Sequence, residues 1–200
     1  RGIGKMRNIL FSLIVLSMLV CSVSTTLAGG VDEYTGLMIH SDTTNGSTVF
    51  EDSSNNGHAI TANGDVNHSS SQSKFGATSM YFDGTGDYLS IPDDSSLNFG
   101  TGDFTIDFWI NTGQPSKNVI GKNSGPEAYL GWYFYIAGNS KISIYGNGNG
   151  YQIESSTTVA DNTWHHIAAV RSGTELSLFI DGIKEDSKIY SADDDIAAPL

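Results

Sequence analysis

The stretch FTIDFWIN, residues 104–111, decides the fold, because its apolar and polar residues alternate without a break. One set comprises Phe104, Ile106, Phe108 and Ile110, and the other comprises Thr105, Asp107, Trp109 and Asn111. Successive side chains of a strand point to opposite faces, so this period of two predicts a strand that is buried on its first face. No stretch after Gly36 keeps a helical period for three turns, and the sequence therefore predicts an all-β domain.

A series of strand-length segments surrounds this stretch. In ELSLFIDGIKE, residues 175–185, the apolar residues alternate and Asp181-Gly182 follows, which predicts a two-residue type I′ hairpin turn. Further segments of strand length are SMYFD (79–83), YLSI (88–91), NVIGK (118–122), GWYFYIA (131–137), KISIYG (141–146) and YQIESSTTV (151–159). Regular spacing of short strands between turns indicates a two-sheet antiparallel sandwich.

The N-terminal residues differ in character from the rest. Arg7 precedes an apolar run over residues 9–20, and small residues then end at Ala28. This pattern predicts a secretory signal peptide, cleaved between Ala28 and Gly29, because the apolar run is too short to span a membrane. We expect a leader over residues 1–28, a linker over 29–36 and one domain over 37–200. The alternative is a lipoprotein cysteine at Cys21, against which the bulky Val20 argues.

The chain is strongly acidic. Its formal charge is −12, and removal of the leader would take three of the ten basic residues and none of the 22 acidic ones, giving −15. Such a surface repels phosphate backbones and anionic lipid headgroups, which argues against nucleic-acid binding and membrane attachment. Neutral glycans, cations and proteins remain as partners, outside the cell or at its surface.

Four stretches carry a resemblance to a known family. They are FEDSSNNGHAITANGDV (50–66), SKFGATSMYFDGTGDYLSIPDDSSLNFGTGDFTIDFWINT (73–112), GWYFYIA and TWHHIAAVRSGTELSLFIDG (163–182). From about Leu37 onward the chain resembles the laminin-G-like jelly-roll domains of the concanavalin A-like lectin/glucanase superfamily. The resemblance implies two curved antiparallel sheets in a secreted, surface or phage adhesion protein. It also implies binding of carbohydrate or protein, and in many members a structural calcium ion.

Two features depart from the family pattern. Asp107 stands where the family mostly has glutamate, and the sequence stops at IAAPL before the closing strands that the resemblance leads us to expect. We expect a C-terminal truncation that leaves an unpaired strand edge and makes the fragment prone to aggregation.

The loop EDSSNNGH, residues 51–58, is the candidate metal site. It concentrates oxygen-bearing side chains, which are the ligands that calcium prefers. With the resemblance, we expect Asp52, Asn56 and backbone carbonyls to hold calcium. The alternative is a polar turn whose side chains bond their own backbone. The acids of FDGTGDYLSIPDDSS (82–96), by contrast, have the spacing of tight turns, and we interpret Asp83, Asp87, Asp93 and Asp94 as turn residues.

Two adjacent histidines raise the question of a second metal or catalytic site. His165 and His166 lie in the predicted strand of TWHHIAAVR, so their side chains must point to opposite faces and cannot share an ion. We expect one imidazole to be packed and the other to be half exposed.

An aromatic segment is the candidate ligand-binding site. Sugars stack on aromatic rings, and we expect Tyr129, Trp132 and Tyr151 to contact the ligand. Alternation pairs Trp132 with Phe134 and Tyr133 with Tyr135, so at least one of these pairs should belong to the core.

Catalysis is not expected. Glycoside hydrolysis needs two acids at a fixed separation, and glucanases of the superfamily carry a Glu-x-Asp-x-Glu strand that no glutamate of this chain matches. The sequence predicts a secreted, non-catalytic recognition or adhesion module for a glycan or surface glycoprotein. The alternatives are a structural or protein-binding domain of a larger adhesion protein and, third, a diverged glycoside hydrolase.

Overall fold

The computed structural model describes residues 9–13, 31–123, 131–146, 151–190 and 199–200. The larger sheet contains β1 (Ile9–Leu13), β3 (Asn67–Ser69), β4 (Ser79–Phe82), β6 (Phe104–Asn111), β11 (Trp164–Ser172), β12 (Glu175–Ile180) and β13 (Ile183–Ile189). Their order across the sheet is β13-β12-β11-β6-β1-β4-β3, and every pair is antiparallel.

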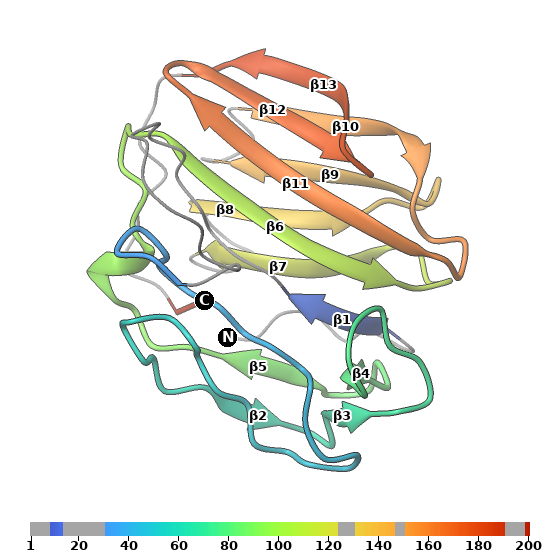
Figure 1. The fold of residues 1–200 in the computed structure, drawn as a ribbon. Coiled ribbons are helices and arrows are strands. Elements are labelled where there is room, and N and C mark those ends of the chain that lie inside the picture. The colour runs from blue at the N-terminus through green and yellow to red at the C-terminus, as the bar shows by residue number, and fades with distance from the viewer. Residues whose placement is uncertain (1–8, 14–30, 124–130, 147–150, 191–198) are drawn as a thin grey trace.

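The second sheet has four antiparallel strands and lies behind the first in Figure 1. Its members are β7 (Lys117–Asn123), β8 (Gly131–Ile136), β9 (Lys141–Gly146) and β10 (Tyr151–Thr158), in the order β10-β9-β8-β7. A separate pair joins β2 (Thr61–Asn63) to β5 (Tyr88–Ser90). The predicted all-β, two-sheet sandwich is confirmed.

The core forms between the inward faces of the two sheets. Phe108 and Ile110 of β6 are fully buried, as the alternation of FTIDFWIN predicts, and so is Ile167 at the register position beside Phe108. The facing rows of the smaller sheet are equally buried: Phe134, Ile136, Ile142, Ile144 and Ile153. Phe108 meets Phe134 edge to face, with ring centroids 5.2 Å apart, which joins the two sheets at the centre of the core.

The hairpin between β12 and β13 has the predicted turn. Asp181 and Gly182 have φ values of 52° and 81°, so both central residues adopt the positive φ that a type I′ turn requires. Glycine adopts this conformation freely, and aspartate tolerates it better than most residues.

A carboxylate on β13 of the larger sheet accepts hydrogen bonds from β10 of the smaller sheet. Glu185 accepts hydrogen bonds from the backbone N–H groups of Ser156 (2.7 Å) and Thr157 (2.9 Å) and from the Thr157 hydroxyl. Burial opposes ionisation of Glu185, but these hydrogen bonds outweigh it and lower its pKa. The acidic side chain thereby satisfies donors on the outer edge of β10, which other chains would otherwise pair with.

Helical structure in the described residues is limited to η1 (Ser95–Leu97), a single 3₁₀ turn. Asp94 caps this turn, since its carboxylate accepts a hydrogen bond from the Ser96 N–H at 2.9 Å. No helix in this part of the chain has the length and apolar character needed to cross a bilayer.

The predicted leader contributes a strand to the larger sheet. Residues 9–13 form β1, which lies between β6 and β4, so no unpaired edge is seen between those two strands. Near the other end of the sequence, Leu200 exchanges two backbone hydrogen bonds with Ile91, of 2.9 and 3.0 Å. The larger sheet thus includes a strand from the N-terminal residues, and the end of the sequence pairs with residue 91.

Replacement of Ile167 tests the assignment of the core. Ile167→Ala removes a fully buried side chain from β11 and should lower the free energy of unfolding by about 2–5 kcal/mol, measured by chemical denaturation. Ile189→Ala, at a position of the same sheet that is 71% exposed, is the matched control and should change stability by less than about 0.5 kcal/mol. Equal losses in the two variants would contradict the assignment.

Candidate functional site

A cluster of tyrosines lies on the outer face of the smaller sheet. Along β8, Phe134 and Ile136 point into the core, whereas Tyr133 and Tyr135 alternate with them and are half-buried on the outside. The register of β8 with β9 places Tyr133 beside Tyr145. We call Tyr133, Tyr135 and Tyr145 the tyrosine cluster.

The rings of the cluster are arranged in contact with one another. Tyr133 and Tyr145 are stacked, with centroids 5.0 Å apart and an interplanar angle of 7°, and Tyr135 meets Tyr145 at 6.5 Å and 71°. The Gln152 amide donates a hydrogen bond of 2.8 Å to the Tyr145 hydroxyl. The outer face of the smaller sheet thus presents aromatic rings beside the Gln152 amide and the Glu154 carboxylate, which accepts a hydrogen bond of 3.3 Å from the Ser143 hydroxyl. Aromatic rings beside hydrogen-bonding groups are the chemistry that a sugar ring needs.

A glycine occupies the position beside Tyr133 on β7. The register pairs Gly121 with Tyr133, and a Cβ atom at residue 121 would lie 2.5 Å from the Tyr133 Cβ and 2.7 Å from the Trp132 carbonyl oxygen. No side chain fits in this position. The row that contains Tyr133 and Tyr145 consequently ends on bare backbone at β7.

Of the residues predicted to bind ligand, the structure describes the side chain of Trp132, which does not lie on this face. Trp132 is 4% exposed and packs in the core, with its ring 5.5 Å from Phe99 and 6.3 Å from Phe134. Trp132 shares the phase of Phe134 and points inward with it, so the structure places it in the core and not on the outer face. Tyr129 and the side chain of Tyr151 lie outside the described part of the chain.

The two histidines point to opposite faces, as predicted. His165 is buried, with Nδ1 2.7 Å from a carboxylate oxygen of Asp181 and Nε2 3.3 Å from one of Asp161. His166 is half-buried on the outer face, where its Nε2 lies 3.3 Å from the Asp107 carboxylate. The imidazoles have separate partners and do not converge on one ion.

Asp107 is an acid on the outer face of the larger sheet. Burial raises the pKa of its carboxyl, and the hydrogen bond and charge of His166 oppose that rise. The same imidazole lies 5.2 Å from the Trp109 ring, and Lys74 Nζ lies 4.1 Å from the Trp109 centroid. The described partner of Asp107 is thus an imidazole, whereas glycoside hydrolysis uses a second carboxyl group.

The loop predicted to bind calcium is organised by Asp52. One carboxylate oxygen accepts from the Met38 N–H (3.0 Å) and the Ser54 N–H (2.8 Å). The other accepts from the Ser54 hydroxyl (2.8 Å) and the His58 N–H (2.9 Å) and lies 2.6 Å from His58 Nδ1. Asn56 donates its amide to the Gly36 carbonyl at 2.9 Å. The fully buried Asp52 carboxylate therefore ties the loop to the chain before it, which fits the polar-turn alternative.

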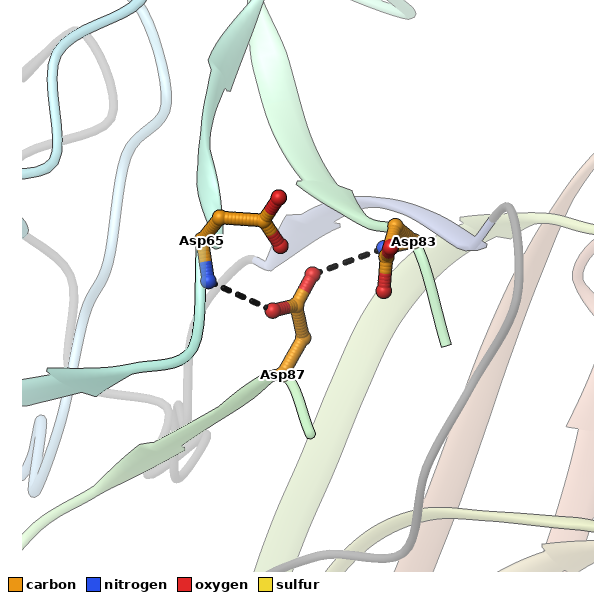
Figure 2. Close-up of side chains that lie close together, drawn as sticks. All are labelled: Asp65, Asp83 and Asp87. Atoms are coloured by element: carbon orange, nitrogen blue, oxygen red, sulfur yellow. Dashed lines mark hydrogen bonds between the residues drawn. The ribbon is translucent and has the colours of Figure 1, made fainter. Parts of the chain in front are cut away.

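A second acidic group combines residues from separate parts of the sequence. Figure 2 shows Asp65, Asp83 and Asp87, each of which offers a carboxylate oxygen within 4.8 Å of the other two. Buried Asp87 accepts from the N–H groups of Asp65 and Asp83, at 2.8 Å each, which confirms that it serves turn geometry. We call these three residues the aspartate trio.

The comparisons with known proteins agree with this architecture. Residues 83–199, more than half of the chain, match the model of the concanavalin A-like lectin/glucanases superfamily. The chain belongs to this superfamily.

Relatives of this superfamily member include two forms of the non-toxic nonhemagglutinin type A of Clostridium botulinum, one of them from strain Kyoto / Type A2. Each is 32% identical over 127 residues, which is 56% of this chain and only 10–11% of the relative. A solved structure, the binding domain of Paraclostridial Mosquitocidal Protein 1, aligns with a TM-score of 0.56 and 18% identity over 96% of this chain and 43% of that chain. At that identity the likeness concerns the fold alone.

Two groups of this lectin-like domain were missed by reasoning from the sequence. Strand alternation was sufficient to place Tyr133 and Tyr135 outside, but their contact with Tyr145 depends on the register between β8 and β9. Asp65 carries no sequence signal for its place beside Asp83 and Asp87, because it comes from another turn.

The hydrogen bonds of Asp52 predict an acid-sensitive contribution to stability. Burial alone would raise its pKa, but hydrogen bonds from Met38, His58 and Ser54 lower the pKa from 3.8 to about 2. A lowered folded-state pKa stabilises the fold above the unfolded value, and this stabilisation is lost as the pH falls from about 4 to about 2. Urea unfolding should show a stability gap between the wild type and Asp52→Asn that is widest at pH 5 and narrows over that range. The control Glu51→Gln changes an exposed neighbour and should show no comparable difference in stability from the wild type. A difference for Asp52→Asn that stays constant with pH would contradict the lowered pKa of Asp52.

Proposed function

We propose that this chain is a secreted, non-catalytic recognition module that binds a neutral carbohydrate through the tyrosine cluster of β8 and β9. The observation that carries the proposal is the stacking of Tyr133 on Tyr145 at 5.0 Å, with Tyr135 and the Gln152 amide beside them. Rings supply apolar faces for the C–H side of a sugar, and amides and hydroxyls bond its hydroxyl groups.

The charge and the superfamily membership support the same ligand class. A formal charge of −12 disfavours phosphate-bearing ligands and leaves a neutral glycan free of repulsion. The superfamily named in the match includes lectins, and the solved structure of similar fold is described as a binding domain. The pairing of Asp107 with His166, in place of a second carboxylate, supports binding without hydrolysis.

A second candidate is a protein-binding domain of a larger adhesion or accessory protein. The curated relatives favour it, because the matching region is only about a tenth of their length. In that case the tyrosine cluster would contact a protein surface, which aromatic residues also favour.

A glycan array probed with the full-length protein tests the proposal and separates the two candidates. We expect binding to a restricted set of neutral glycans, with affinity reduced at least about tenfold in Tyr133→Ala and in Tyr145→Ala, since a tenfold loss corresponds to about 1.4 kcal/mol of ring contact. Tyr34→Ala, which removes a tyrosine that is 50% exposed outside the cluster, is the control and should bind as the wild type does. An array without binding would contradict carbohydrate recognition; binding that persists in both cluster variants would contradict only the site.

We further propose that the domain holds a structural calcium ion, and the geometry favours the aspartate trio over the loop of Asp52 and Asn56. Protein donors already occupy both oxygens of Asp52. Backbone N–H groups also bond both oxygens of Asp87 and one oxygen of Asp83. The support for the trio is therefore its third member, since no described hydrogen bond is donated to the Asp65 carboxylate, which lies with the other two carboxylates within 4.8 Å. Oxygen ligands in an irregular arrangement suit calcium.

Thermal unfolding with calcium or EDTA tests this proposal. Calcium should raise the unfolding midpoint of the wild type, since an ion that binds the native state stabilises it. The rise should disappear in Asp65→Asn and remain in Asn56→Ala. A rise that disappears in Asn56→Ala and remains in Asp65→Asn would instead indicate an ion site in residues 51–58. A wild-type midpoint that neither calcium nor EDTA changes would contradict calcium binding.

A further inference from the structure

A carboxylate lies in the row next to the stacked tyrosines on the outer face of the smaller sheet. The register pairs Tyr135 of β8 with Ser143 of β9, and Ser143 with Glu154 of β10. The next row on the same face pairs Tyr145 with Gln152. Opposite residues of antiparallel strands share a face, and their diagonal neighbours lie about 7–8 Å apart. Glu154 is thus a diagonal neighbour of Tyr145 and belongs to the surface that carries the tyrosine cluster.

Two long hydrogen bonds orient the Glu154 carboxylate. The hydroxyl of Ser143, a fully buried residue, donates to one oxygen at 3.3 Å, and the Asn139 amide donates to the other at 3.4 Å. Both are longer than ordinary hydrogen bonds, which reach about 3.0 Å for O–H···O and about 3.2 Å for N–H···O. A carboxylate oxygen has more than one lone pair, so each oxygen of Glu154 can accept a further and shorter hydrogen bond.

No cation pairs with this carboxylate in the part of the chain that the structure describes. The described ion pairs join other acids to lysine and histidine side chains. The N–H of Glu154 donates to the Asp186 carboxylate at 3.3 Å, which brings a second negative charge toward it and not a positive one. Glu154 is also half-buried. A half-buried acceptor that the protein satisfies only weakly gains from the donors that a ligand brings.

We propose that Glu154 selects sugars that carry two adjacent unsubstituted hydroxyl groups, an inference that rests on the carbohydrate function proposed above. The apolar face of the sugar packs against the tyrosine cluster, and the two hydroxyls each donate a hydrogen bond to one oxygen of Glu154. Equatorial hydroxyls project from the edge of a sugar ring, so a sugar on the rings can direct them at the neighbouring row. An ionised carboxylate accepts hydrogen bonds and donates none, and its two oxygens lie side by side, which matches a pair of adjacent O–H donors.

Selectivity on a glycan array probed with the full-length protein tests this role of Glu154. The wild type should bind glycans that expose two adjacent hydroxyls, and the same glycans with one hydroxyl of the pair O-methylated should bind at least about tenfold more weakly, because a charge-assisted hydrogen bond is lost. Glu154→Gln should lose at least about tenfold in affinity for the unmodified glycans and should distinguish less between the two sets, since an amide offers one acceptor oxygen in place of two.

Glu51→Gln removes the same charge at an exposed position outside both sheets and should bind as the wild type does. Wild-type affinity and selectivity in Glu154→Gln, with binding lost in Tyr133→Ala, would overturn this inference and leave the proposed function in place. Equal binding of methylated and unmodified glycans by the wild type would do the same. Stronger binding of glycans with a free amino group would show that the carboxylate selects a cation, which also overturns the inference. An array without binding would contradict the proposed function itself.

Discussion

The contact between Phe108 and Phe134 is the interaction on which the remaining structure depends. The two rings come from different sheets, meet edge to face at 5.2 Å, and are both fully buried. Neither sheet can exclude water from its own inward face, so each requires the apolar row of the other. The buried isoleucines of β8, β9, β10 and β11 belong to the same apolar cluster. Strand pairing, turns and outer faces are all positioned by that cluster.

A rigid interior supports the recognition role that we propose for the outer face of the smaller sheet. Because Trp132, Phe134 and Ile136 are fixed in the core, the backbone between them holds Tyr133 and Tyr135 outward at a set spacing. The rings are thereby ordered in the absence of a ligand, so less side-chain entropy would be lost in the proposed binding. The small size of Gly121 belongs to the same arrangement, since β7 approaches Tyr133 closely there.

The acidity of the chain has an internal as well as an external role. Asp52, Asp87 and Glu185 each accept hydrogen bonds from two or more backbone N–H groups of loops or strand edges. Carboxylates suit this task because a charged acceptor makes stronger hydrogen bonds than a neutral one. Part of the excess of acidic residues therefore fixes loops of an all-β fold in which many connections lack regular structure. For this reason the oxygen-rich loop of residues 51–58 resembles a metal site in sequence, although the carboxylate of Asp52 is buried and bonded to protein groups.

The sequence alone determined the properties that follow from neighbouring residues. Strand alternation identified β6, its buried face, the opposite directions of His165 and His166 and the turn at Asp181-Gly182, because the backbone of a strand fixes side-chain direction from one residue to the next. Tertiary structure decided everything that depends on which strands meet. It placed Trp132 inside, Tyr133 against Tyr145, Asp65 beside Asp83 and Asp87, and Ile9–Leu13 between β4 and β6. Register and strand order arise from contacts between segments far apart in the chain, and local periodicity carries no information about those contacts.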